Sequence, residues 1–360
     1  MKYDADVCIV GAGPGGALLA YLLAKQNVSV ILLERHQKIA KSFRGEHLNE
    51  EGEAILKKYG LFSKVEKLGM LPMESLEYWE NGKLIKKILP DPNVGHLGIH
   101  VPQAHLLKVL IEEASQYPNF TLMTNTRVVD LLLNENGSFY GVKAMHEGKE
   151  LTILSRLTVG ADGRFSTVRK KAGIEVNKRK HGYDLLWARI PAPQGWEPSI
   201  KMARIDGYQL SLFTQTNNYI QIGWNIKEDS FPELRKQPFD TFIEKLIKAF
   251  PILVSSVKEN ITSWNDFVVL DVHSNFSENW GRNGVAFLGD AVHTMTPTGA
   301  FGLNSAMKDA DSLAQVITPE KINELDLITC ELNRKKEIEK LQAIQIEKEQ
   351  NFATQFVIYS

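Results

Sequence analysis

A glycine-rich turn near the N-terminus constrains the fold more than any other feature of this sequence. A short apolar run at 7–10 precedes the turn, and an Ala- and Leu-rich segment follows it to about residue 25. These are typical of a buried parallel strand and a helix. A second apolar run at 28–33 ends at Glu34. The turn itself has the spacing Gly11-x-Gly13-x-x-Gly16. This order of segments predicts a β-α-β unit and therefore an α/β fold.

Each glycine of the turn has a physical role in holding a dinucleotide. Gly11 permits the tight turn, Gly13 lets the backbone approach a pyrophosphate, and Gly16 allows close packing of helix on strand. Phosphates bind the free N–H groups and the positive dipole end of the helix. An acid at the end of the second strand can accept hydrogen bonds from ribose hydroxyls. The sequence therefore predicts dinucleotide contacts at Gly11, Gly13, Pro14, Gly15, Gly16 and Glu34.

Composition and charge limit what else the chain does. Its 360 residues are 43% hydrophobic and 24% charged, which predicts about two globular domains. The formal net charge of -1 gives no global field that would attract nucleic acid or an anionic membrane. Two distant cysteines predict neither a disulfide framework nor a metal site. Without a secretory signal or a membrane span in the sequence, we expect a cytoplasmic protein.

Two further motifs carry a family resemblance. Residues 159–169, which contain Asp162-Gly163, resemble the "DG" motif of single-component flavoprotein aromatic hydroxylases. Residues 289–304, which begin Gly289-Asp290, resemble their "GD" motif. The order of fingerprint, DG and GD is that of the family typified by p-hydroxybenzoate hydroxylase. The resemblance implies a Rossmann-like FAD-binding domain with an interleaved antiparallel-sheet substrate domain and a C-terminal helix.

The resemblance also implies which residues contact FAD. In the family, the GD aspartate (here Asp290) bonds the ribityl chain, and the DG pair (here from Asp162) supports the FAD pyrophosphate and NAD(P)H. Backbone amides after Gly299 would face the flavin N1/O2 edge. Arg44 is the candidate for the FAD phosphates and Arg35 for the adenosine side. The remaining cofactor-side candidates are Gln103 for the ribityl chain, with Val128, Gly289, Pro297, Gly302, Leu303 and Asn304.

The chain departs from the family at Ala300-Phe301, where Gly-Gln or Gly-Gly is common. This departure leaves the shape of the flavin-side loop open.

The implied chemistry is that of an FAD-dependent monooxygenase. NADPH or NADH, bound transiently as co-substrate, would reduce FAD, and O₂ would add at C4a. The C4a-hydroperoxyflavin would then hydroxylate an aromatic or polycyclic small molecule. Because the cofactor does this chemistry, no catalytic side chain is assigned. The alternatives are a flavin-dependent halogenase, although its Trp-x-Trp-x-Ile-Pro signature is absent, an isoprenoid reductase of related fold, and a non-catalytic flavin- or ligand-binding protein.

Strong alternation along residues 183–226 predicts the antiparallel sheet of the substrate domain. We expect the substrate between the flavin ring and this sheet. Packing inside the protein is an equal interpretation for every candidate, and alternation leaves open which face of the sheet lines the pocket. The candidates are Trp187, Gln209, Tyr219, Gln221 and Trp224. The expected FAD-binding segments are 1–70, 100–180 and 265–320, the substrate segments 71–99 and 181–264, and the C-terminal helix 321–360.

Overall fold

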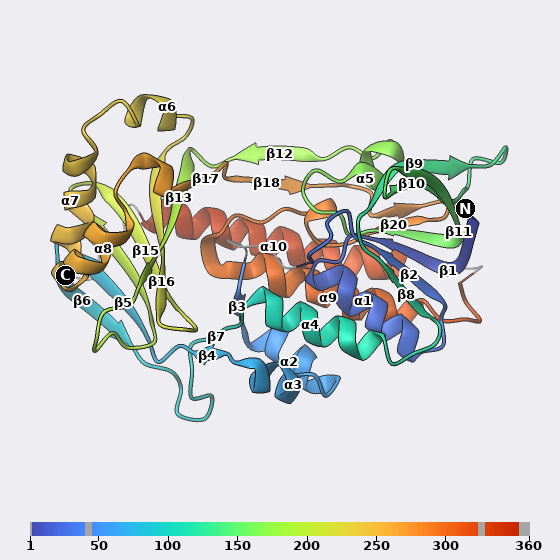
Figure 1. Ribbon diagram of the computed structural model, residues 1–360, viewed down its shortest axis with the longest axis horizontal. Helices are drawn as coiled ribbons and strands as arrows, with labels where there is room; N and C mark the ends of the chain where they lie inside the picture. The colour runs from blue at the N-terminus through green and yellow to red at the C-terminus, as the bar shows by residue number, and fades with distance from the viewer. Residues whose placement is uncertain (1, 40–44, 323–327, 353–360) are drawn as a thin grey trace. The chain divides into compact units, whose positions relative to one another are not determined.

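The computed structural model describes residues 2–39, 45–322 and 328–352, and the chain divides into two compact units (Figure 1). Among the described helices, none is both long enough and apolar enough to cross a membrane. The described residues also contain no group of three or more His, Cys, Asp or Glu side chains placed to hold a metal ion. Unit 1 comprises 1–68, 103–179 and 274–345, and unit 2 comprises 69–102, 180–273 and 346–360.

A mainly parallel sheet forms the centre of unit 1. Its strands follow the order β19-β20-β11-β1-β2-β8, with the antiparallel strands β10 and β9 added along β11. The central strands are apolar and buried on both faces, as parallel strands covered by helices must be. Their bounds are β1 Lys2–Val10, β2 Val30–Leu33, β8 Phe120–Met123, β9 Thr126–Leu133, β10 Phe139–His146, β11 Lys149–Gly160, β19 Gly281–Arg282 and β20 Val285–Phe287.

Helix α1 (Pro14–Lys25) packs against both α4 (Gln103–Ala114) and α9 (Phe301–Val316) (Figure 1). Ten of its twelve residues are buried, which explains its nearly continuous Ala and Leu content. Helix α10 runs from Ile328 to Phe352, and its residues up to Gln345 belong to unit 1. The smaller elements of unit 1 are β3 His47–Leu48, α2 Glu50–Lys58, α3 Phe62–Leu68, α5 Thr167–Lys171, η3 Gly289–Ala291 and η4 Thr298–Ala300.

Unit 2 is built on a seven-stranded sheet in the order β17-β13-β16-β15-β14-β5-β6. Its strands are β5 Ser75–Glu80, β6 Lys83–Ile88, β13 Tyr183–Pro191, β14 Ser199–Ile205, β15 Tyr208–Gln215, β16 Tyr219–Lys227 and β17 Val268–Leu270. Helices α7 (Phe239–Ala249) and α8 (Val254–Asn260) pack on one face through an apolar core. The short elements are β4 Leu71–Pro72, β7 Ile99–His100, α6 Phe231–Leu234, η1 Pro251–Leu253 and η2 Trp264–Asp266, while β12 Asn177–Lys180 and β18 His273–Phe276 span the unit boundaries.

The α/β fold class predicted from the sequence is confirmed. The stretch 121–129 belongs to two strands, β8 and β9. The chain turns between β8 and β9 at Asn125, whose φ of 52° lies in the left-handed region that asparagine tolerates.

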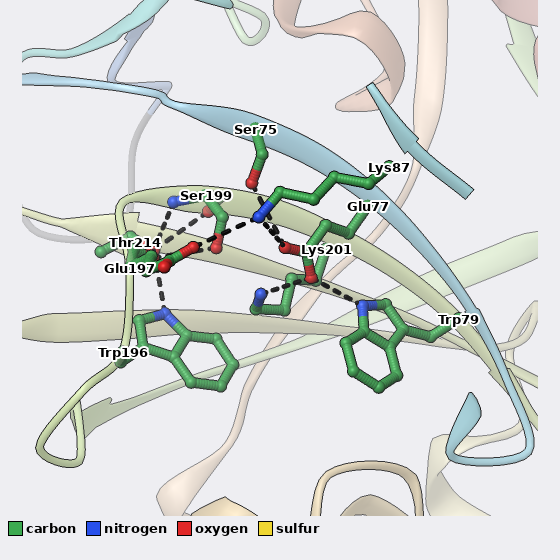
Figure 2. Close-up of polar contacts among 9 residues, drawn as sticks. All are labelled: Ser75, Glu77, Trp79, Lys87, Trp196, Glu197, Ser199, Lys201 and Thr214. Atoms are coloured by element: carbon green, nitrogen blue, oxygen red, sulfur yellow. Dashed lines mark hydrogen bonds and ion pairs between the residues drawn. The ribbon is translucent and has the colours of Figure 1, made fainter. Parts of the chain in front are cut away.

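A buried ion pair joins β5 to β14 in unit 2 (Figure 2). Lys201 Nζ lies 2.5 Å from Glu77 Oε2, and the two residues are direct partners in the parallel ladder. The Trp79 indole N–H donates to the same carboxylate at 2.9 Å, and the ammonium lies 4.7 Å from the centre of the Trp196 ring. Burial raises the pKa of Glu77, but Lys201, Trp79 and Lys87 more than offset it, so its pKa is lowered. Glu77 therefore remains a carboxylate beside Lys201, and the pair opposes any change of register of β5.

Substituting Lys201→Met should lower the free energy of unfolding by about 3 kcal/mol, because it leaves the Glu77 charge buried with only the weaker partner Lys87. The double variant Lys201→Met/Glu77→Gln should recover part of this loss. Urea unfolding followed by circular dichroism measures both. The matched control is Lys83→Met on the exposed edge strand β6. A Lys201→Met protein as stable as that control would contradict a structural role for the pair.

Candidate functional site

The carboxyl ends of four parallel strands lie side by side in unit 1. Val10, at the end of β1, is the register partner of Leu33 in β2 and of Gly160 in β11, and Gly160 in turn partners Phe287 in β20. The segments that follow these strands therefore meet at one edge of the sheet. They contain the glycine-rich turn, Glu34, the DG motif and the GD motif. Ligands of open α/β sheets bind at this edge.

Packing and backbone conformation restrict three glycines of the turn. Gly11 has a φ of 108°, and a Cβ there would lie 2.4 Å from the Ala161 carbonyl oxygen. A Cβ on Gly16 would lie 2.0 Å from the Gly11 carbonyl oxygen. Gly15 is restricted in the same way by α9, since its Cβ would meet the Ala306 carbonyl oxygen at 2.9 Å. These contacts bring the first turn of α1 directly against the strand ends.

Gly13 is different, because a Cβ built there meets nothing within 4 Å. Its φ of -72° and ψ of 177° suit any residue, so neither backbone strain nor packing explains a glycine here. Gly13 is the N-cap of α1, where backbone N–H groups are available to an anion. The open space beside a bare backbone fits the pyrophosphate of a dinucleotide.

Glu34 follows β2 and turns its carboxylate toward the glycine-rich turn. Oε2 accepts from the Ala12 N–H at 3.2 Å and Oε1 from the His36 N–H at 3.0 Å, and the residue is 8% exposed. The side chain is thus held in one orientation at the edge of the site. Its neighbour Arg35 is exposed and donates to the His36 ring at 3.0 Å.

The DG motif caps a short helix. The carboxylate of Asp162 accepts from the Ser166 hydroxyl and from the backbone N–H groups of Thr167 and Val168, at 2.7 and 3.2 Å. Burial raises the pKa of Asp162, and these hydrogen bonds only partly counter the effect. The Asp162 side chain therefore orients the loop that leads into α5.

Two arginines of the DG motif reach the GD motif. Arg164 Nε lies 4.0 Å from Asp290 Oδ2, and the buried Arg169 guanidinium donates to the Ala291 carbonyl. The side chain of Asp290 is 38% exposed. The motifs are far apart in the sequence, and the structure brings them together.

The loop before α9 contains the departure noted in the sequence. Gly299 has a φ of 76°, and Ala300 follows it with a φ of 54°, a left-handed conformation that costs a residue with a Cβ about 1 kcal/mol. Pro297 precedes both as the N-cap of η4, and Gly302 and Leu303 lie in the first turn of α9. Ala300 thus adopts a conformation that glycine accepts more easily.

Asn304 holds this loop through its side chain and does not point a free amide at a ligand. Oδ1 accepts from the Asn49 N–H at 3.1 Å, while Nδ2 donates to the carbonyls of His47 and Ala300 at 3.0 Å. The residue is 1% exposed. Its side chain joins the start of α9 to the segment before α2.

The remaining residues predicted to contact the cofactor lie elsewhere in unit 1 or outside the described residues. Val128 is buried in β9 within the apolar core of unit 1. Gln103 is the first residue of α4, and its N–H donates to Glu46 Oε1 at 3.0 Å. Arg44 lies outside the described residues.

The five substrate candidates divide between the two faces of the unit 2 sheet. Trp224 is fully buried against α7, stacked on Phe242 with ring centroids 3.9 Å apart. Apolar residues at alternate positions of β13, β15 and β16 share this face. The other four candidates occupy the intervening positions and therefore lie on the opposite face: Trp187, Gln209, Tyr219 and Gln221.

That opposite face is polar and aromatic. Trp187 and Ser211 flank Gly223, whose Cβ would lie 2.5 Å from the serine hydroxyl. Gln209 accepts from the Asn225 amide at 2.9 Å, and Gln221 accepts from Gln215 at 2.6 Å. The Arg189 guanidinium lies 4.6 Å from the Tyr219 ring centre.

A buried polar network that was not predicted from the sequence lies beneath the GD motif. Asp309 in α9 is 2% exposed and accepts from the Gly289 N–H at 2.9 Å, from His293 at 2.6 Å and from Arg334 at 2.8 Å. Burial alone would raise the pKa of Asp309, but His293, Arg334 and the Gly289 N–H lower it to about 2. Arg334, Ile338 and Gln345 recur at helical spacing along the charged tail, and the structure buries all three. This spacing was the sequence signal for a buried face of the tail helix.

Comparison with known proteins agrees with this geometry. The FAD binding domain family matches residues 4–320. The chain is 30% identical to 6-methylpretetramide 4-monooxygenase of Streptomyces rimosus, over 95% of this chain and 82% of that protein. It is 27% identical to squalene epoxidase 4 of Arabidopsis thaliana, over 87% of this chain but only 62% of that longer protein. P. aeruginosa PqsL in complex with 2-aminobenzoylacetate superposes with a TM-score of 0.81, at 21% identity, covering 98% and 99% of the two chains.

The fold and the family match define a flavoprotein. The chain belongs to the FAD binding domain family, within the p-hydroxybenzoate hydroxylase-like group, and is an FAD-dependent monooxygenase.

Comparing Gly13→Ala with Gly16→Ala distinguishes a glycine that ligand binding requires from a glycine that packing requires. Gly13→Ala should fold with nearly unchanged stability, because its Cβ meets nothing, yet should bind FAD at least about tenfold more weakly by obstructing the pyrophosphate. Gly16→Ala should lower the melting temperature even without FAD, because its Cβ would meet the Gly11 carbonyl. Thermal unfolding of the apoprotein and FAD fluorescence titration measure these effects. Unchanged FAD affinity in Gly13→Ala would remove this turn from the cofactor site.

Proposed function

We propose that this enzyme uses NADH or NADPH and O₂ to hydroxylate an aromatic or polycyclic small molecule. FAD supplies the redox chemistry when bound. In this proposal the N-terminus of α1 holds the pyrophosphate, Glu34 accepts from the ribose, and Asp290 accepts from the ribityl chain. The observation that carries the proposal is the open backbone at Gly13 beside strand ends that carry both family motifs.

The chain's own residues would orient the cofactor. Arg164, whose Nε lies 4.0 Å from Asp290 Oδ2, would help to direct that carboxylate. The first turn of α9 would direct the positive end of the helix dipole toward the flavin, which favours a negative charge on the reduced ring. This arrangement supports a role in oxidation chemistry without a catalytic side chain.

The substrate is proposed to contact the face of the unit 2 sheet turned away from α7 and α8. The half-buried Trp187 offers an aromatic surface, and the amides of Gln209 and Gln221 offer donors at fixed positions, because each amide oxygen already accepts a hydrogen bond. A planar ring with carbonyl or phenolic oxygens suits such a surface. In this assignment Trp224 supports the sheet from its other face.

The proposed activity is tested with the FAD-reconstituted protein. Each of NADH and NADPH is combined with a panel of phenols, quinolones and aromatic polyketides, and O₂ uptake and product mass are measured. The expected result is substrate-dependent O₂ uptake, with one ¹⁸O atom from ¹⁸O₂ in the product. A product containing chlorine, or a product in which a double bond is reduced and no oxygen is added, would contradict hydroxylation.

Asp290→Ala should weaken FAD binding about tenfold, since a charged acceptor of this kind contributes roughly 1.5 kcal/mol. The side chain is 38% exposed, so the apoprotein should keep its melting temperature. Asp311→Ala is a useful comparison, because this carboxylate of α9 bonds Lys58 and Tyr59 instead. Equal FAD affinity in both variants would exclude Asp290 from the cofactor site.

A further inference from the structure

The inner face of α10 holds the flavin-side loop by its backbone. Gln345 is 1% exposed, and its Nε2 donates to the carbonyls of Thr296 and Thr298 at 2.9 and 2.6 Å. Its Oε1 accepts from the Thr296 N–H at 3.3 Å. One side chain therefore satisfies three backbone groups of the loop.

Two further residues of α10 extend this contact along the loop. Gln342 Nε2 donates to the Thr294 carbonyl at 3.2 Å and to the Asn275 carbonyl at 2.9 Å. Arg334 acts at the other end of the loop, through Asp309, which accepts from the Gly289 N–H. We call these three side chains, Arg334, Gln342 and Gln345, the α10 clamp.

The hydrogen bonds of the two clamp glutamines do not depend on protonation, whereas Asp309, through which Arg334 acts, also bonds His293. The two glutamines carry no titratable group, and Asp309 remains a carboxylate because its pKa is held at about 2. Arg334 also pairs with Glu337, which in turn pairs with Lys308. Arg334, Glu337 and Lys308 are thus joined by ion pairs.

The clamp ends where the left-handed segment begins. Thr298, the last residue it holds, directly precedes Gly299 and Ala300, and α9 starts at Phe301. Three glutamine hydrogen bonds to Thr296 and Thr298 therefore determine the direction from which the chain enters α9. On the side of the loop, these bonds involve backbone atoms only.

We propose that Gln345 is a positioning residue for the flavin, which acts by fixing the 296–300 backbone and thereby the first turn of α9. This inference rests on the proposed placement of the flavin at that turn. A displaced turn would present its N–H groups and dipole less favourably to the reduced flavin. Loss of the clamp should then weaken FAD binding and make reduction of the flavin less favourable.

The test compares Gln345→Met with Gln345→Glu, both of similar size to glutamine. Methionine removes all three polar contacts, while glutamate keeps the acceptor for Thr296 N–H but cannot donate to the two carbonyls. The measurements are the FAD dissociation constant, the midpoint potential of the bound flavin and its absorption spectrum. Glu339→Ala, an exposed position on the same helix, is the matched control.

Both Gln345 variants should bind FAD at least about tenfold more weakly than the control, with a more negative midpoint potential and a shifted flavin spectrum. If they do not fold, Gln342→Met is the substitute. This variant removes only the two hydrogen bonds of the half-buried Gln342, and it should show the same changes to a smaller extent.

Unchanged potential and spectrum in a folded variant would overturn the proposal, even if its melting temperature fell, because that combination indicates a structural role only. A wild-type protein that binds FAD but incorporates no oxygen would contradict the proposed function and leave this comparison valid. A wild-type protein that binds no FAD would overturn both.

Discussion

Contact between the first turn of α1 and the ends of β1 and β11 is the constraint on which the rest of unit 1 depends. A Cβ on Gly11 would lie 2.4 Å from a backbone carbonyl oxygen, and a Cβ on Gly16 would lie 2.0 Å from another. Both distances are steric clashes, so the helix reaches this position only with glycine at both sites. Once it is there, α1 packs on α4 and α9. The strand ends remain uncovered at Gly13, where an anion finds free N–H groups.

The second condition for this site is that segments distant in sequence keep fixed paths. Irregular backbone lacks the regular hydrogen bonds of a helix or a sheet. Each buried N–H or C=O that stays unpaired destabilises the fold by roughly 1–3 kcal/mol. In this protein, side chains from neighbouring helices supply the partners. Asn304 joins the start of α9 to the segment before α2, Asp309 receives the Gly289 N–H, and Gln345 holds the loop between them. The GD motif is thus supported by its own Asn304 and by two residues outside it, Asp309 and Gln345.

The two faces of the unit 2 sheet lie in different surroundings. One face packs on α7 and α8, and its alternate residues are apolar, with Trp224 among them. The opposite face carries amides and aromatic rings, several already paired with one another. The ion pair between Glu77 and Lys201 joins a hairpin from an early part of the chain to the later strands. Register of that hairpin is therefore specified by charge as well as by shape.

The sequence alone was sufficient for the α/β class, the glycine-rich turn with its strand and helix, and the family, because these depend on short-range spacing and steric limits at single glycines. Tertiary structure decided what required distant partners. It separated Trp224 from the other four substrate candidates, placed Val128 in the core, and gave Asn304 three backbone partners. Alternation in a strand shows only that two faces differ, and spacing along a helix does not identify what it packs against. Only the folded chain shows which face α7 covers and which loop Gln345 holds, since both depend on contacts between segments far apart in sequence.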